Sequence, residues 1–362
     1  MKFFDKALEP DVNELIEIIT CKKAGKRVHF IELFLDKEIK DSICERFDIG
    51  RRINPNTPFA DIQKDIELHR FLGYDAFRVG VCGKDVFSLK RISTADTTAE
   101  AGQSRGKREW TEEHVGVIQT WEDFEKYDWP KISEIDFGVF EWMDKNLPAN
   151  MGCYDLTANV FEIVSFLLGY ETMCYKMFDD PKLVDAIFEK VGQFYVEYTR
   201  AMCDFSSVKL IWGSDDLGFK TGMLLSAKDL REKALPWHKK CAEIAHEHNR
   251  PYLLHSCGKL DEIMDDLIDD VGIDAKHSYE DVIMPVAEFK TRYGKRVAVL
   301  GGIDVDFLCR ADEAAIRRRV RKTLEECVLG GGYCLGTGNT VANYIPVDNY
   351  LTMLDEGRKF TF

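Results

Sequence analysis

Long apolar runs and an excess of positive charge are both missing from this sequence. No stretch of about 18 consecutive apolar residues occurs in the 362-residue chain, and the first residues lack the apolar run of a signal peptide. The 49 Lys and Arg residues are outnumbered by 63 Asp and Glu, which gives a formal net charge of -14. We therefore expect neither a membrane nor a nucleic acid as the main partner.

Nucleotide-binding motifs and internal repeats are also missing. No glycine-rich dinucleotide fingerprint follows the first predicted strand, no P-loop occurs, and no repeat of solenoid length is found. The glycines at 330–332 precede a predicted strand, so they are expected to end a helix. These absences disfavour a doubly wound nucleotide-binding sheet, which is the main competing architecture.

Cysteines are present without the spacing of a disulfide framework. The chain has 11 of them, and its 45% hydrophobic and 31% charged residues are typical of a globular protein. Scattered thiols of this kind are expected to stay reduced, which predicts a cytoplasmic location.

Predicted strands alternate with predicted helices along the whole chain. Eight such strands predict an α/β fold of the (β/α)₈ TIM-barrel type, forming a single domain over residues 1–362. A helical segment precedes the first strand, and a long polar loop or ribbon excursion spans about 91–120. The predicted strands are residues 28–34, 75–80, 150–155, 208–216, 252–257, 274–278, 297–301 and 333–336.

The most informative short segment is His255-Ser-Cys257, at the end of the fifth predicted strand. Side chains alternate across a strand, so His255 and Cys257 point the same way. An imidazole and a thiol placed together can bind a soft divalent metal, with zinc the first choice. The alternative is a buried histidine beside an inert core cysteine.

Other polar residues follow the same ends of the predicted strands, where the chemistry of a barrel is placed. Acidic and metal-binding groups that meet at one mouth are unfavourable unless a cation or a substrate offsets their charge. The candidates are Glu32, Asp36, Arg78, Tyr154, Asp155, Asp215, Asp216, His277, Glu280, Asp304, Cys334, Thr337 and Asn339.

Five motifs in the C-terminal half carry a family resemblance. They are Gly213-Ser-Asp-Asp-Leu-Gly218, Pro236-Trp-His-Lys239, His255-Ser-Cys-Gly258, Leu300-Gly-Gly-Ile-Asp304 and Leu335-Gly-Thr-Gly-Asn339. The stretch from 213 to 357 resembles the uroporphyrinogen decarboxylase superfamily. The resemblance implies a (β/α)₈ barrel. It also implies one of two activities, because the superfamily contains haem-pathway decarboxylases and zinc methyltransferases that serve corrinoid proteins.

The decarboxylase pattern is not matched. Those enzymes resemble one another in an arginine-rich segment after the first strand, which binds the carboxylates of the substrate. Here that place reads Ile31-Glu-Leu-Phe-Leu-Asp36, which is acidic and apolar. Asp75 is only a loose counterpart of their catalytic aspartate. Uroporphyrinogen decarboxylation is therefore not the expected reaction.

The methyltransferase pattern is matched in part. Resemblance to that branch implies zinc ligands at His255 and Cys257, plus a cysteine on strand eight. That cysteine would fall near 337–339, where the sequence has none, and the nearest thiol is Cys334. A carboxylate is the other candidate for completing the site, with Asp216 or Asp215 preferred over Glu32 and Asp304.

The resemblance thus implies a zinc-dependent methyltransferase. Zinc would act as a Lewis acid while a methyl group moves from a methylated small molecule, for example a methyl ether, to cobalamin on a separate corrinoid protein. Three alternatives stay open: a methylcobamide:thiol methyltransferase, a decarboxylase-like enzyme, and a non-catalytic metabolite-binding barrel. A homodimer is what the family resemblance suggests.

Roles for the remaining residues follow from this expectation. We assign catalytic roles to His277, Asp304 and Glu32, with His277 either a proton donor or a partner that orients a metal ligand. Asn339 and Tyr154 are assigned to cofactor contact. Trp212, Tyr279 and Tyr344 are further candidates for an aromatic pocket, with core packing as the alternative. Arg105, Lys107 and Arg108 are expected to cover the mouth, to contact the partner, or simply to face solvent.

Overall fold

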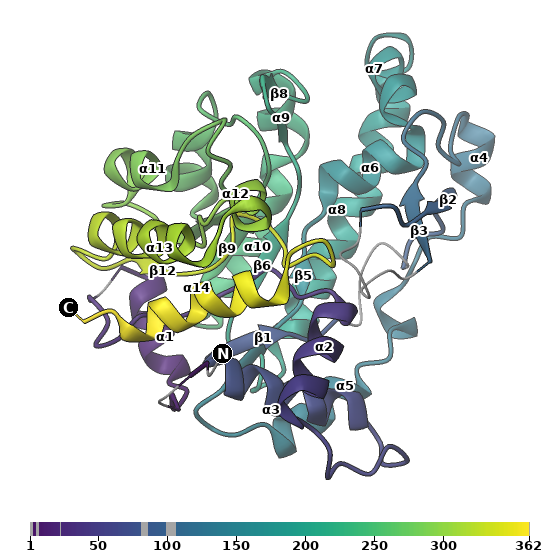
Figure 1. Ribbon diagram of the computed structural model, residues 1–362. Helices are drawn as coiled ribbons and strands as arrows, with labels where there is room; N and C mark the ends of the chain where they lie inside the picture. The colour runs from purple at the N-terminus through teal and green to yellow at the C-terminus, as the bar shows by residue number, and fades with distance from the viewer. Residues whose placement is uncertain (1–2, 5–6, 22, 81–85, 99–105, 362) are drawn as a thin grey trace.

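The computed structural model describes residues 3–4, 7–21, 23–80, 86–98 and 106–361 (Figure 1). Its α-helices are α1 Val12–Ile19, α2 Lys37–Phe47, α3 Ala60–Leu72, α4 Trp121–Lys126, α5 Gly138–Asn146, α6 Val160–Leu168, α7 Tyr170–Asp179, α8 Pro181–Cys203, α9 Ala227–Lys233, α10 Leu235–Glu247, α11 Val286–Tyr293, α12 Val305–Arg310, α13 Glu313–Cys327 and α14 Val347–Lys359. A 3₁₀ turn, η1, spans Ile132–Glu134, and a π-helical segment, η2, spans Asp266–Val271.

The strands are short, and those of the central sheet alternate with helices as predicted. They are β1 Ala76–Arg78, β2 Arg91–Ala95, β3 Lys107–Thr111, β4 Gly152–Tyr154, β5 Leu156–Thr157, β6 Ile211–Ser214, β7 Gly218–Phe219, β8 Gly222–Met223, β9 Tyr252–His255, β10 Ala275–His277, β11 Ala298–Leu300 and β12 Tyr333–Cys334.

Parallel pairing organises the centre of the molecule. A six-stranded parallel sheet has the order β12-β11-β10-β9-β6-β5, and β1 pairs with β4 in a second parallel sheet. Isolated parallel bridges join the two sheets: Phe30 bridges both Tyr74 and Leu335, and Cys153 bridges Val208. The α/β class with a parallel, TIM-barrel-like arrangement is therefore confirmed. Closure into eight continuous strands rests on single bridges and is part of our proposal.

The predicted first strand, residues 28–34, differs from the expectation. The structure gives it no extended ladder, only the bridges at Phe30, with a further bridge from Leu35 to Val341. Each of the other seven predicted strands contains an observed strand. A cavity of about 350 Å³ is lined by residues of this segment and of β1, among them Phe34 and Phe77.

Two apolar layers hold the strands in place. The outer layer packs the strands against the helices that surround them, and the inner layer fills the space enclosed by the strands. The amphipathic helix α1 contributes Val12, Leu15, Ile18 and Ile19 to this inner layer, so it covers the N-terminal ends of the strands. Asp11 caps α1 by accepting a hydrogen bond from the Glu14 amide at 3.0 Å.

The excursion predicted at about 91–120 contains an antiparallel ribbon, β2 paired with β3, which lies beside α4 at one edge of the molecule (Figure 1). Arg108 on β3 donates to the Asn343 side chain at 2.6 Å and lies over the Tyr344 ring. The ribbon is thus fastened to the loop that follows β12. Arg105 lies outside the described residues.

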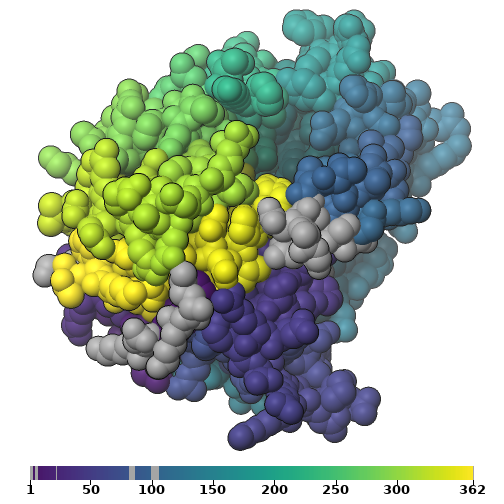
Figure 2. All heavy atoms as spheres, in the orientation of Figure 1, coloured from purple at the N-terminus to yellow at the C-terminus, as the bar shows by residue number. Residues whose placement is uncertain are grey.

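The surface shows how distant parts of the sequence meet. In Figure 2 the C-terminal residues, drawn in yellow, lie between the N-terminal segment in purple and the green region of about residues 280–330. Among the described residues, no helix combines the length and the apolar character needed to cross a bilayer.

Candidate metal centre

Three ligand-type side chains from two neighbouring strands meet at one point. His255 is the last residue of β9, Cys257 follows two residues later, and Asp216 comes two residues after β6, whose Ser214 is aligned with His255. His255 Nε2 lies 3.5 Å from Cys257 Sγ and 3.4 Å from Asp216 Oδ1. In the described part of the chain, these are the three His, Cys, Asp or Glu residues that cluster closely enough to share an ion.

Close contact between two loops brings these ligands together. Gly258 has a φ of +90°, and a Cβ there would lie 2.1 Å from the Gly218 carbonyl carbon. Only glycine therefore fits at this crossing, immediately after Cys257. The Cys257 amide donates to Asp216 Oδ1 at 2.9 Å, so the backbone of one ligand orients the carboxylate of another.

Hydrogen-bond partners fix which nitrogen of His255 faces the ligands. His277 Nε2 lies 3.2 Å from the Thr337 carbonyl, which can only accept, so that nitrogen carries a proton. Burial and the charge of His255 hold the pKa of His277 well below its usual value, so its Nδ1 is an acceptor. His255 Nδ1 must then donate across the 2.7 Å contact to His277, which leaves Nε2 for a metal.

The electrostatics favour positive charge at the centre of the group. Burial lowers the pKa of His255, but Cys257 and Asp216 outweigh burial and raise that pKa to about 10. Burial acts to raise the pKa of Asp216, yet the hydrogen bonds from His255 and the Cys257 amide bring it below its usual value. A proton on His255 supplies the positive charge in the structure, and a divalent cation can replace it.

The donor set fits zinc. Imidazole nitrogen, thiolate sulfur and carboxylate oxygen are its usual ligands, and three protein ligands with one open position are typical of catalytic zinc sites. The His255 side chain is 6% exposed, whereas that of Asp216 is 41% exposed, so the group is reachable from one side. The residues therefore fit the metal that the sequence predicts.

Asp215 has a different task from its neighbour. Its carboxylate accepts hydrogen bonds from the Phe161 and Glu162 amides at 2.9 and 2.8 Å, at the start of α6. It also lies 2.9 Å from His238 Nε2, and both side chains are fully buried. Asp215 thus fastens α6 and α10 to the end of β6. It faces away from the metal group, which consists of Asp216, His255 and Cys257.

Two polar side chains contact the Cys257 sulfur. Asn339 Nδ2 donates to it at 3.4 Å, and the Ser278 hydroxyl donates at 3.6 Å. Asn339 lies in the segment in which the family pattern called for a cysteine. Ser278 was not among the predicted site residues, and its position as the last residue of the predicted sixth strand was the available signal.

Glu32 holds the turn that carries Asn339. The Thr337 amide donates to Glu32 Oε1 at 2.9 Å, and the Thr337 hydroxyl contacts Oε2. Burial raises the pKa of Glu32 to about 8 against the hydrogen bonds from Thr337. A protonated Glu32 can donate to the Thr337 hydroxyl, which then donates to the Asn339 carbonyl at 2.8 Å. Glu32 is therefore not one of the three clustered residues, and it is connected to them through the turn at Thr337 and Asn339.

The remaining predicted residues lie elsewhere. Asp304 caps α12 by accepting from the Phe307 amide at 2.9 Å, and it accepts from the Asp281 amide at 2.9 Å as well. Tyr154 is buried against Trp212, with ring centroids 4.8 Å apart, and its hydroxyl donates to the Glu32 carbonyl.

Cys334 is fully buried in the inner apolar layer and is not part of the metal group. Burial raises the pKa of its thiol, and the charges that act on it next are those of Asp75 and Arg27. Asp75 directly precedes β1, so this thiol lies toward the N-terminal ends of the strands. The structure therefore separates it from His255 and Cys257.

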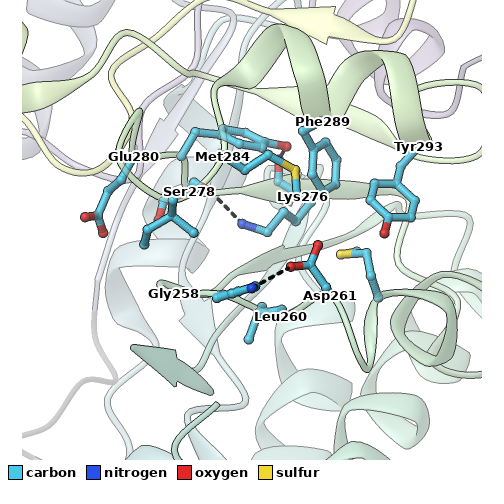
Figure 3. A pocket seen from close by; sticks show the side chains of 13 residues that line it. Gly258, Leu260, Asp261, Lys276, Ser278, Glu280, Met284, Phe289 and Tyr293 are labelled. Atoms are coloured by element: carbon cyan, nitrogen blue, oxygen red, sulfur yellow. Dashed lines mark hydrogen bonds and ion pairs between the residues drawn. The ribbon is translucent and has the colours of Figure 1, made fainter. Parts of the chain in front are cut away.

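Lys276 is a buried cation behind the metal group that sequence reasoning missed. Its ammonium donates to the Ser278 carbonyl at 2.5 Å (Figure 3). It also donates to the Ser256 carbonyl at 3.2 Å and lies over the Tyr279 ring. Burial lowers its pKa to about 8. A lysine in the middle of a predicted buried strand was the signal that could have identified it.

Two hollows, a cavity and a groove, lie near the C-terminal ends of the strands. The cavity of about 350 Å³ is lined by Glu32, Arg78 and Tyr154 among others. A groove of about 920 Å³ is lined by Asn339, Asp304, Tyr279 and Tyr344 among others. Because Asn339 contacts Cys257, the groove borders the metal group and offers space for a small molecule.

Comparison with known proteins gives a family and a fold. The family described as uroporphyrinogen decarboxylase (URO-D) matches residues 142–360, more than half of the chain. A methyltransferase from Methanosarcina mazei superposes with a TM-score of 0.71 over 97% of this chain and 99% of its own, at 15% identity. A uronate isomerase from Bacillus halodurans covers 96% and 86% of the two chains at 10% identity, with a TM-score of only 0.32. No curated protein matches the sequence significantly.

Proposed function

The chain belongs to the uroporphyrinogen decarboxylase family, and within that family we propose that it is a zinc-dependent methyltransferase. In this proposal it moves a methyl group from a methylated small molecule, such as a methyl ether, to a corrinoid protein. The observation that carries the proposal is the meeting of Asp216, His255 and Cys257 beyond adjacent parallel strands. The proposal includes a single domain over 1–362 whose eight strands close into a barrel.

Two features speak against decarboxylation of a tetrapyrrole with many carboxylates. The segment 31–36 brings Glu32, held by Thr337, in place of arginines. Asp75, the loose counterpart of the decarboxylase aspartate, is fully buried and lies 2.7 Å from His29 at the N-terminal ends of the strands. Chemistry in barrels is placed at the opposite ends. Family membership and the fold likeness support an enzyme of the methyltransferase type instead.

The chain's own residues divide the work. His255, Cys257 and Asp216 would hold the zinc, and His277 orients His255 through the 2.7 Å contact between their Nδ1 atoms. A zinc ion bound there supplies Lewis-acid chemistry to the heteroatom that carries the methyl group. The exposed side of Asp216 is the side from which substrate and partner would enter.

The ligand set favours demethylation of a small molecule over methylation of a thiol. One thiolate and one carboxylate donate less electron density than two thiolates, so a bound cation stays more electrophilic. Cys334 is left out of the proposed set because it lies in the inner apolar layer with Asp75 and Arg27 acting on its thiol. His277, Glu32 and Asn339 act through other residues in this proposal, and Asp304 and Tyr154 support the structure.

Zinc content and methyl transfer test this function together. We expect close to one zinc per chain in the wild type, and methyl transfer from an aryl methyl ether to free cob(I)alamin, followed by its absorbance. His255→Ala and Cys257→Ser should lose both and keep the far-UV circular dichroism of the wild type. Cys44→Ser, a buried cysteine on α2, is the matched control and should keep both.

Each contrary result has a clear meaning. A wild-type chain that takes up no zinc under reducing conditions overturns the metal site and the zinc-dependent methyl transfer, and leaves the decarboxylase-like and non-catalytic alternatives. Zinc binding with methylation of a thiol by methylcobalamin, and no demethylation of ethers, assigns the reverse direction to the same ligands.

A further inference from the structure

We propose that Asn339 and Ser278 are positioning residues that set how strongly the Cys257 sulfur donates to a metal. The inference rests on the proposed zinc site and extends it beyond the three ligands. Both side chains donate to Cys257 Sγ, at 3.4 Å from the Asn339 amide and at 3.6 Å from the Ser278 hydroxyl. Outer hydrogen bonds of this kind tune a metal through its ligand.

The orientation of the Asn339 amide is fixed by a second contact. The Thr340 backbone amide donates to Asn339 Oδ1 at 2.8 Å, so the oxygen is committed and the nitrogen faces the sulfur. An amide nitrogen donates hydrogen bonds and has no lone pair for a metal. Asn339 therefore lies next to the metal group as a donor to its thiolate.

The turn that carries Asn339 is braced from two sides. Glu32 holds the Thr337 amide and hydroxyl, and the Thr337 hydroxyl lies 2.8 Å from the Asn339 carbonyl. The Gly338 carbonyl accepts from the Tyr279 amide at 2.9 Å, and a Cβ on Gly338 would lie 2.1 Å from the Tyr279 oxygen. The segments that supply the two donors are thus hydrogen-bonded to each other.

Ser278 is held from behind by Lys276. The buried ammonium donates to the Ser278 carbonyl at 2.5 Å (Figure 3). It also donates to the Ser256 carbonyl at 3.2 Å, which links the segment that carries Ser278 to the segment that carries His255 and Cys257. The pocket that the ammonium borders, about 40 Å³, is lined by Gly258 and Ser278. Ser278 is therefore placed against Cys257 by contacts that do not depend on the sulfur.

A preorganised pair of donors has a definite chemical consequence. Hydrogen bonds to a thiolate withdraw charge from sulfur, so the thiolate gives less charge to a cation that it binds. A bound cation then polarises a substrate heteroatom more strongly. The same effect makes a second, bound thiol a poorer nucleophile, so the pair favours removal of a methyl group from a small molecule.

Cobalt(II) in place of zinc gives a direct readout of the sulfur. The wild type should show a sulfur-to-cobalt charge-transfer band in the ultraviolet, and Asn339→Leu and Ser278→Ala should each move it to longer wavelength. The double variant should move it further. Thr340→Val, in the same loop, keeps the backbone amide that holds Asn339 and should leave the band unmoved. Zinc content should stay near one per chain in both single variants, while kcat for demethylation falls about tenfold.

The outcomes separate this inference from the proposed function. Bands that coincide in the wild type, Asn339→Leu and Ser278→Ala overturn the tuning role while the zinc site stands. A shift of the same size in Thr340→Val also overturns it, because the loop alone is then responsible. If the wild type binds neither cobalt nor zinc, the function and the inference fall together. Should Asn339→Leu fail to fold, Ser278→Ala removes one hydroxyl and decides the question by itself.

Discussion

Two buried histidines with acidic neighbours lie at opposite ends of the strands. At the C-terminal ends, His255 faces Asp216 and Cys257. At the N-terminal ends, His29 lies 2.7 Å from Asp75 and 3.3 Å from Glu14 on α1. The residue types are similar, yet the two arrangements differ in where the acidic atoms lie around the ring.

At the N-terminal ends the acidic groups are divided between the two ring nitrogens. Asp75 meets Nδ1 of His29 and Glu14 meets Nε2, so the two carboxylates cannot share one ion with that ring. Arg27 donates to Asp75 at 2.5 Å and the Lys26 amide donates to Glu14 at 3.0 Å, which satisfies both acids within the chain.

At the C-terminal ends, sulfur and carboxylate gather around a single nitrogen of His255, while His277 occupies the other. No arginine or lysine makes an ion pair with Asp216 among the described residues. A completed salt-bridge network satisfies the acidic groups at one end, whereas the arrangement at the other end is the one that the proposed metal site requires.

Replacing His255 or His29 should give the largest effects, and the two effects should differ in kind. One should fall on metal binding and the other on stability. His255→Ala is expected to abolish metal binding and methyl transfer with little loss of stability. His29→Ala leaves buried Asp75 with Arg27 and buried Glu14 with the Lys26 amide in place of an ion pair, and it should lower the free energy of unfolding by about 3–5 kcal/mol. Metal content per folded chain should not change in His29→Ala. Denaturant unfolding and elemental analysis of both variants check this, and metal loss in His29→Ala would erase the contrast.

Substitutions of the adjacent carboxylates Asp215 and Asp216 test the same contrast, between stability and metal binding, within the C-terminal ends of the strands. Asp215→Asn weakens hydrogen bonds from Phe161, Glu162 and His238 and should lower the free energy of unfolding by about 1.5–3 kcal/mol, with metal retained. Asp216→Asn should keep the stability and weaken zinc binding by more than about 100-fold, because a ligand matters more than its outer partners. Competition with a chromogenic chelator measures the affinity, and equal zinc affinities would show that Asp216 is not a ligand.

The raised pKa of Glu32 predicts that the free energy of unfolding depends on pH, whether or not a metal is bound. Its pKa is about 8 in the folded chain because it is buried, against 4.5 in the absence of the fold. The folded state holds this proton more tightly, so the stabilisation is complete below pH 4.5 and is lost as the pH rises to about 8. The loss is at most about 5 kcal/mol. Glu32→Gln keeps the hydrogen-bonding shape of the neutral acid and should lack this loss in urea unfolding at pH 5 to 8. Parallel curves for the two proteins would mean that Glu32 is ionised throughout.

Alternation along strands was enough to place the centre of the site. It put His255 and Cys257 on one side of the fifth strand, and the structure brings them within 3.5 Å. It could not choose between Asp215 and Asp216, because alternation gives opposite sides without saying which side faces inward. The contacts of Asn339 and Ser278 with the sulfur depend on segments about 80 and 20 residues away, so no local pattern predicts them.

Regular alternation also failed where strands end early. The first predicted strand, 28–34, has only bridges at Phe30, and a cavity lies between its later residues and β1. The eighth strand was predicted over residues 333–336. Strand β12 ends at Cys334, and Gly336 passes so close to the Ile31 carbonyl that a Cβ would lie 1.9 Å from its oxygen.

Cys334 gives the smallest expected effect and the most direct check on that reasoning. Cys334→Ser places a hydroxyl in the inner apolar layer and should lower the free energy of unfolding by about 1–3 kcal/mol, with zinc content unchanged. Cys257→Ser should do the reverse, because its side chain is partly exposed and is one of the three proposed metal ligands. Mass spectrometry of the two metal-loaded proteins compares them directly. Zinc lost in Cys334→Ser, with the fold intact, would mean that the thiol reaches the metal and that the two ends of the strands are not separated as described.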